Sequence, residues 1–245
     1  MPFTFAHASA VLPIKSKKFN LSALILGSMA PDFIYFILFN PSSNFGHSYA
    51  GFILFNLPMC FLINYLFYRY IQETFIDSMP KFVSDRYMYM TMCKNKICNA
   101  MDFWKFTYSA LIGMLTHVFW DSFTHRTGFF VVNFPLLNEN INVLNMDIPL
   151  YKILQHGSTV IGFLIMFIYF YNVRDKSGKS YNISINKKRI WLSLISIFVI
   201  TMILSIVVFI KLDLFIGIGR IVVTIINSVF ISYVITGIFV NYMWK

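Results

Sequence analysis

Residues 191–210, WLSLISIFVITMILSIVVFI, hold no charged side chain. A second uncharged stretch, IVVTIINSVFISYVITGIFV, follows at residues 221–240. An α-helix needs about 20 mainly apolar residues to cross the hydrocarbon core of a bilayer. Each stretch is therefore long and apolar enough to form a transmembrane helix.

The composition of the whole chain agrees with these two stretches. Of 245 residues, 58% are hydrophobic and 12% are charged, and the mean hydropathy is +0.66. A soluble domain has about 45–50% apolar and about 25% charged residues. The chain is too apolar to be disordered, and three cysteines are too few for a disulfide scaffold. The composition therefore predicts an integral membrane protein.

Four further apolar stretches precede these two, at residues 21–39, 49–68, 106–123 and 157–172. Together they predict an all-α, polytopic helical membrane protein with about six transmembrane helices. The first stretch contains Pro31-Asp32. Because proline lacks the backbone N–H that a helix interior needs, we expect this first helix to be broken there.

Lysine and arginine are distributed unequally between the loops. With six spans, sixteen of the 20 Lys and Arg fall on one set of loops and termini, and four fall on the other. Cytoplasmic loops are enriched in these residues, so the split predicts that both termini are cytoplasmic. The same bias explains the net charge of +10 without a nucleic-acid partner.

The basic segment 173–189 is the clearest change in composition along the chain. We expect it to be a cytoplasmic loop. It would separate a membrane domain at 1–172, which holds all five histidines, from a two-helix membrane extension at 190–245.

The sharpest polar element is THVFWD, residues 116–121. His117 and Asp121 are four residues apart, so on a helix they share one face. Such a pair can hold a metal ion. It can also form a hydrogen bond that packs one helix against another, and the spacing alone favours neither interpretation.

Other ionisable residues converge on the same end of the predicted bundle. Ionisable groups inside a membrane usually face the bundle interior and mark function. Under the six-span topology, four groups approach the non-cytoplasmic side: His47, Asp121, His125 and His156. Two more, Asp32 and His117, lie within a few turns of it. Two acids and four histidines at one end resemble a metal site more than scattered packing contacts.

His7 conflicts with this arrangement. The charge rule places it at the cytoplasmic N-terminus. It reaches the cluster only if residues 3–14 fold back into the membrane, for example as a short re-entrant helix that ends at Pro13.

Five stretches resemble a bacterial integral-membrane family catalogued as domain of unknown function 4184. They are PFTFAHASAVLPI (2–14), SALILGSMAPDFIYF (22–36), FGHS (45–48), THVFWDSFTHRTGFF (116–130) and LYKILQHGS (150–158). The resemblance is close over about 1–172, and beyond that it extends only to hydropathy. The order of the motifs is also distantly similar to that of inner-membrane metal-dependent hydrolases.

This resemblance implies a site and a location. It implies a divalent metal held by His7, Asp32, His47, His117 and Asp121. The hydrolase hypothesis makes His117 and Asp121 catalytic residues, with Asp121 as general base if it is not a ligand. The resemblance gives His125, His156 and Thr116 supporting or substrate-contacting roles. It also implies a location in the bacterial cytoplasmic (inner) membrane.

Three kinds of function are compatible with the sequence. A metal-dependent hydrolase would use a divalent ion, zinc by ligand type, to activate water against a lipid or lipid-linked phosphoester, so that membrane lipid is the expected partner. An ion or small-solute transporter would use the broken helix and the intramembrane acids as its path. A structural membrane protein would use the polar cluster only for packing. The hydrolase is the leading hypothesis.

Overall fold

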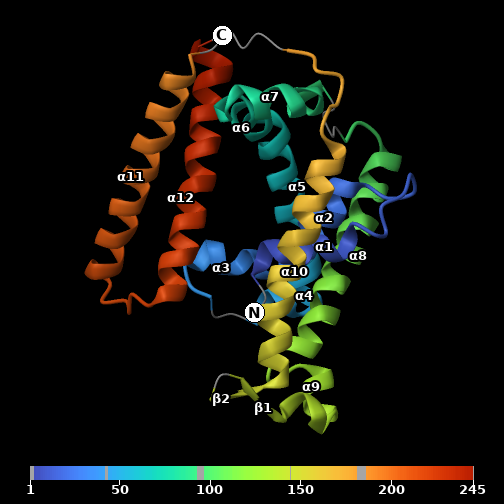
Figure 1. Cartoon of the computed structure of the whole chain (residues 1–245). Coiled ribbons are helices and arrows are strands. Elements are labelled where there is room, and N and C mark those ends of the chain that lie inside the picture. The colour runs from blue at the N-terminus through green and yellow to red at the C-terminus, as the bar shows by residue number, and fades with distance from the viewer. Residues whose placement is uncertain (1–2, 42–43, 93–96, 144, 181–185, 245) are drawn as a thin grey trace. The chain divides into compact units, whose positions relative to one another are not determined.

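The computed structural model describes residues 3–41, 44–92, 97–143, 145–180 and 186–244. Nearly all of the regular structure in these ranges is helical, which confirms the predicted all-α class (Figure 1). Within these described ranges, five helices are long and apolar enough to cross a membrane: Leu21–Leu38, Tyr49–Ser78, Leu150–Val173, Lys187–Lys211 and Ile218–Trp244. The chain is a helical membrane protein.

The helices follow one another along the chain with short connections. The α-helices are α1 (Ala8–Val11), α2 (Leu21–Met29), α3 (Phe33–Leu38), α4 (Tyr49–Gly51), α5 (Leu57–Leu66), α6 (Gln72–Ser78), α7 (Lys81–Tyr87), α8 (Ala100–Thr124), α9 (Phe129–Asn133), α10 (Leu150–Val173), α11 (Lys187–Lys211) and α12 (Ile218–Phe239). Short 3₁₀ segments lie at Thr4–His7, Ala30–Asp32, Phe45–His47, Met88–Met92 and Pro135–Asn138. π-helical turns lie at Phe52–Asn56, Phe67–Ile71 and Val240–Trp244.

The first span is broken where the sequence predicted. Helix α2 ends at Met29, a 3₁₀ turn covers Ala30–Asp32, and α3 begins at Phe33. Pro31 supplies no backbone N–H, so the regular hydrogen-bond ladder cannot continue through this turn. The break gives the chain a place to turn a carboxylate inward.

The predicted span at 106–123 lies within α8 but is not among the five spans found by length and composition. At 25 residues, α8 is long enough to cross a bilayer. Its hydroxyl, imidazole and carboxyl side chains make it less apolar than the other five helices. Helix α8, which carries His117 and Asp121, is thus less hydrophobic than the helices identified as spans.

Contacts divide the chain into two compact units. The first unit combines Met1–Phe33, Asn44–Phe61 and Ile97–Val173, and the second combines Ile34–Ser43, Leu62–Lys96 and Arg174–Lys245. The passage from Val173 to Arg174 coincides with the start of the predicted cytoplasmic loop, of which residues 181–185 lie outside the described ranges. The predicted division into domains at 173–189 stays a prediction.

In the first unit, α2 packs closely against α8 (Figure 1). A Cβ atom added at Gly27 would lie 2.1 Å from the Ala110 carbonyl oxygen, and one at Gly113 would lie 2.4 Å from that of Leu24. Both positions therefore need glycine, since any side chain would push the two backbones apart. Small residues of this kind let membrane helices approach closely.

A small β-hairpin that the sequence analysis did not predict precedes α10 in the same unit. Strand β1 (Asn140–Val143) pairs antiparallel with β2 (Met146–Pro149). The hairpin follows α9, so the described residues between α8 and α10 include a short helix and a hairpin (Figure 1).

The second unit is built on an antiparallel pair, α11 and α12, joined by a short connection (Figure 1). The Ser193 and Thr236 hydroxyls lie 2.9 Å apart between these helices. The indole N–H of Trp191 donates to the Ser78 carbonyl at the end of α6, at 3.0 Å. The pair is thereby tied to the segment that follows α5.

Candidate metal centre

Helix α8 contributes the two residues that the sequence singled out first. His117 and Asp121 lie on one face of the helix, and Nε2 of His117 is 3.2 Å from Oδ2 of Asp121. The helix ends at Thr124, and Nδ1 of the next residue, His125, lies 3.4 Å from Oδ1 of Asp121. One face of α8 therefore aligns two imidazoles on either side of a carboxylate.

Close packing of α2 on α8 sets the orientation of the His117 ring. Nδ1 of His117 lies 2.8 Å from the backbone carbonyl oxygen of Ser28. A carbonyl oxygen can only accept, so we assign the imidazole proton to Nδ1. Nε2 then carries a lone pair, which is the arrangement of a metal-binding histidine held by an outer hydrogen bond.

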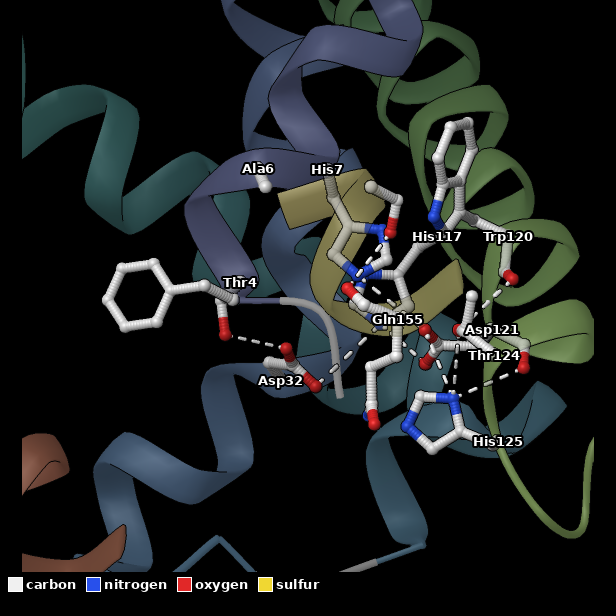
Figure 2. A network of polar contacts seen from close by, with 12 residues as sticks. Thr4, Ala6, His7, Asp32, His117, Trp120, Asp121, Thr124, His125 and Gln155 are labelled. Atoms are coloured by element: carbon white, nitrogen blue, oxygen red, sulfur yellow. Dashed lines mark hydrogen bonds and ion pairs between the residues drawn. The ribbon is translucent and has the colours of Figure 1, made fainter. Parts of the chain in front are cut away.

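The broken helix supplies the second carboxylate. Asp32 is fully buried, and the Thr4 hydroxyl donates to its Oδ2 at 2.6 Å. Its other oxygen, Oδ1, lies 3.7 Å from Nε2 of His117 and 3.8 Å from Nε2 of His47. Thr4 thus occupies one oxygen and leaves the other directed at the histidines (Figure 2).

The N-terminal segment folds back onto the cluster. From the sequence we expected this fold as the condition for His7 to join the other histidines. Residues Thr4–Val11 form a 3₁₀ turn and α1, which end before Pro13. The His7 ring stacks on His117 with centroids 3.9 Å apart, and its Nε2 lies 3.6 Å from Oδ1 of Asp121. Burial, with a smaller contribution from His117, lowers the pKa of His7 to about 3. His7 is therefore neutral at physiological pH, the form that binds metal.

A short loop after the break places His47. Its Nε2 lies 3.5 Å from Oδ2 of Asp121. The Ser48 hydroxyl accepts from the Gly51 N–H at 3.0 Å, and the Asn56 amide donates to the Gly46 carbonyl at 2.7 Å. These two hydrogen bonds hold the turn on both sides of His47.

The five side chains form two overlapping groups that could hold a metal ion. One group is His7, His117 and Asp121, the other is Asp32, His47 and His117, and in each the ligand atoms lie within 4.8 Å of one another. Four buried atoms in these groups have no hydrogen-bond partner among the described residues: Nε2 of His7 and His117 and Oδ1 of Asp32 and Asp121. A buried polar atom left unsatisfied costs about 1–3 kcal/mol. Nitrogen and carboxylate oxygen together are a donor set that suits zinc. The residues present therefore fit a divalent cation (Figure 2).

The three residues predicted to support this set have different places. His125 borders the cluster, and burial lowers its pKa. His156 is exposed on α10 and belongs to neither ligand group. The Thr116 hydroxyl donates to the Gly113 carbonyl of its own helix at 2.7 Å. The structure therefore brings only His125 of these three to the cluster.

Sequence reasoning missed Thr4, the Ser28 carbonyl and Gln155. Figure 2 shows the Gln155 side chain pointing into the region between Asp32 and His125. Thr4 lies one helical turn before His7, so the two side chains share one face. This spacing could have identified Thr4 as a residue of the site. A backbone carbonyl carries no residue signature, so the role of Ser28 could not be found in this way.

The fold and the cluster define a class: a helical membrane protein with a buried His/Asp site. Within this class, the chain belongs to the family described as domain of unknown function (DUF4184), whose model matches residues 1–238. The family therefore extends beyond the region of about 1–172 to which the sequence resemblance was limited, and includes most of α12. No curated protein and no solved structure matches the chain.

Proposed function

We propose that this protein is a membrane-embedded, metal-dependent hydrolase acting on a lipid or lipid-linked phosphoester. The observation that carries the proposal is the convergence of buried imidazole nitrogens and carboxylate oxygens that lack hydrogen-bond partners among the described residues. These atoms lie 3.2–3.8 Å from one another as ion pairs. Buried polar groups are normally hydrogen-bonded, so a cation among them would satisfy the groups that are not.

The proposed ligands are His7, Asp32, His47, His117 and Asp121. A bound divalent ion such as zinc would lower the pKa of a water molecule and polarise a phosphoryl oxygen. Ser28 holds the His117 ring through its Nδ1–H, and Thr4 holds Asp32 through Oδ2. These contacts orient the ligands before any ion or substrate arrives.

His125 is the proposed proton acceptor at the edge of the site. Its Nδ1 lies 3.1 Å from the Asp121 carbonyl oxygen, which supports placing the ring proton there. Its Nε2 has no hydrogen-bond partner in the described part of the chain. The side chain is 25% exposed, whereas those of His117 and Asp32 are 0% exposed. Because Nε2 is itself buried, His125 would take its proton from a water molecule held within the site.

Location and orientation complete the proposal. The family resemblance supports the bacterial cytoplasmic membrane, and the distribution of Lys and Arg supports cytoplasmic termini. On that topology, the end of α8 that carries Asp121 and His125 faces the non-cytoplasmic side. A lipid or lipid-linked substrate is proposed because the cluster is built on helices that cross or border the bilayer.

Metal content is the test of this proposal. Purified wild type, His117→Ala and Asp121→Asn are compared by mass spectrometry after supplementation with zinc or manganese. His156→Ala is the matched control, because it removes a histidine outside both ligand groups. We expect one or more tightly held ions per chain in wild type and the control, and less than a tenth of that in the other two variants.

Phospholipid hydrolysis in mixed micelles is then measured on the same four proteins. We expect turnover to fall more than 100-fold in the two ligand variants. Folded wild type that binds no metal would sink the proposal and leave the ion-path and packing hypotheses, for which flux in vesicles is the next assay.

A further inference from the structure

An exposed apolar surface lies directly beside the open edge of the metal centre. It consists of Phe129, Val132, Phe134 and Leu136, which we call the α9 patch. Their exposed fractions lie between 53% and 67%. Between residues 126 and 149 the sequence has only three charged residues, Arg126, Glu139 and Asp147. A connection of this composition is unusually apolar for a surface in water.

The α9 patch is held in place by specific contacts. The Phe130 ring stacks on Phe123 of α8 with centroids 4.0 Å apart, and Val131 is fully buried. The Asn138 amide donates to the Val131 carbonyl at 2.7 Å. The inner face of α9 is therefore anchored, and the outer face is presented in a fixed direction.

A tight turn connects the patch to the site. The Gly128 N–H donates to the His125 carbonyl at 2.8 Å. A Cβ atom at Gly128 would lie 2.5 Å from the Ser122 carbonyl oxygen, so this turn needs glycine. The partly exposed site residues are His125 at 25% and His47 at 21%, whereas His7 is 1% exposed. These two rings are therefore the most exposed part of the cluster, and His125 lies at the end of α8 from which α9 departs. Nε2 of each ring is itself buried.

The patch is adjacent in the chain to exposed apolar residues on α8 and α10. On α8, the nearby Leu115 and Phe119 are about 60% exposed, and on α10 Val160 and Ile161 are similarly exposed. Helix α9 covers only Phe129–Asn133, so it is far too short to cross a bilayer. An apolar, aromatic element between two long helices suits the interfacial layer of the membrane.

We propose that the α9 patch lies in the lipid interface and is the surface on which a phospholipid enters the metal centre. The acyl chains lie against the patch and α10, and the headgroup phosphate reaches the opening at His47 and His125. The contact of the α9 patch with lipid is inferred only from its exposed apolar side chains and from its position between α8 and α10. The entry of a phospholipid into the metal centre rests on the proposed hydrolase function.

Contact with lipid is tested by fluorescent labelling in vesicles of phosphatidylcholine and phosphatidylglycerol. Single cysteines replace Phe129 or Val132 in a chain whose own cysteines are changed to alanine. Val160→Cys is the lipid-facing reference, and Glu139→Cys is the water-facing reference. We expect spin-labelled lipid to quench the labels at 129 and 132 at least half as strongly as at 160, and iodide to quench mainly the label at 139.

Two results would overturn the proposal. Quenching of 129 and 132 by iodide to the same degree as 139 would place the patch in water. Protection from both quenchers, with disulfide cross-linking between chains, would identify the occupant as a second copy of the protein.

The substrate step is tested with the double variant Phe129→Ser/Val132→Ser. We expect kcat/KM for phospholipid in vesicles to fall about 10-fold, while kcat/KM for a monomeric short-chain phospholipid and the metal content remain unchanged. Ile203→Ser on α11, an exposed apolar residue outside the α9 patch and α10, is the control. Equal losses on both substrates would refute the entry role. Failure of wild type to hydrolyse either substrate would refute the hydrolase function, and the quenching result would still decide the membrane contact.

Discussion

Asp121 is the centre of the cluster at the scale of single residues. Nitrogens of four histidines lie within 3.2–3.6 Å of its carboxylate: His7, His47, His117 and His125. The other carboxylate, Asp32, instead has one oxygen bound by the Thr4 hydroxyl. The two acids therefore have different tasks: Asp121 gathers the histidines, and Asp32 is oriented from the N-terminal segment.

Replacing Thr4 with valine tests that orientation. Valine keeps the shape of threonine but cannot donate to Asp32, so Oδ1 loses its fixed direction. We expect zinc affinity to fall about 10-fold, the lower end of the range for such supporting contacts, with the helical circular dichroism unchanged. Competition with a chromogenic chelator measures the affinity.

Thr4→Ser is the matched variant, because serine restores the hydroxyl. It should retain affinity within about threefold of wild type, a margin of less than about 0.7 kcal/mol. Equal affinity in wild type and Thr4→Val would show that the hydrogen bond does not position the ligand.

The contact between α2 and α8 controls the site at the scale of secondary-structure elements. Gly27 and Gly113 let the helices approach until the Ser28 carbonyl meets the His117 ring. Asp32 follows α2 directly in the chain. A change in helix separation would therefore move ligands from both elements at once.

Gly113→Ala should separate the two helices. The new methyl group would lie 2.4 Å from the Leu24 carbonyl oxygen, which must move away. Overpacking of this kind costs about 1–3 kcal/mol, so we expect a lower unfolding temperature in detergent and weaker zinc binding in the same protein.

Gly157→Ala on α10 is the control for this substitution, because nothing lies within 4 Å of its added Cβ. It should leave the unfolding temperature unchanged or raise it slightly, since alanine favours helix by up to about 1 kcal/mol. A Gly113→Ala protein as stable as Gly157→Ala would contradict the close packing.

Charge decides orientation at the scale of the whole molecule. Most basic residues fall on one set of loops. The candidate site lies near the C-terminal end of α8, at the opposite end of that helix from the basic loop that precedes it. The topology therefore predicts that the candidate site is reached from the non-cytoplasmic side of the membrane.

Cysteine labelling in intact cells tests the topology. A cysteine at Ser177, in the basic loop, should react with a membrane-impermeant maleimide only after the cells are opened. A cysteine at Asn142, in the hairpin, should react in intact cells, because the positive-inside rule places it outside. Both positions are exposed. Reaction of both from one side would disprove the six-span arrangement.

Sequence reasoning predicted the helical membrane class and the break at Pro31, because hydropathy and proline act locally along the chain. It also identified the residues that meet in the cluster, although His7 joined them only through a resemblance. The hairpin at 140–149 was missed because each strand has only four residues, too few for their alternation of polar and apolar side chains to stand out.

The sequence by itself determined that this chain enters a membrane. It also placed the few His and Asp residues of the apolar segments near one end of the predicted bundle. Those properties follow from the solvation of each side chain, which needs no knowledge of its neighbours. Only the tertiary structure decided that the N-terminal segment turns back to stack His7 on His117. It also decided that His125 borders the site while His156 remains exposed. Such contacts join residues far apart in the chain, and they depend on how closely the helices pack.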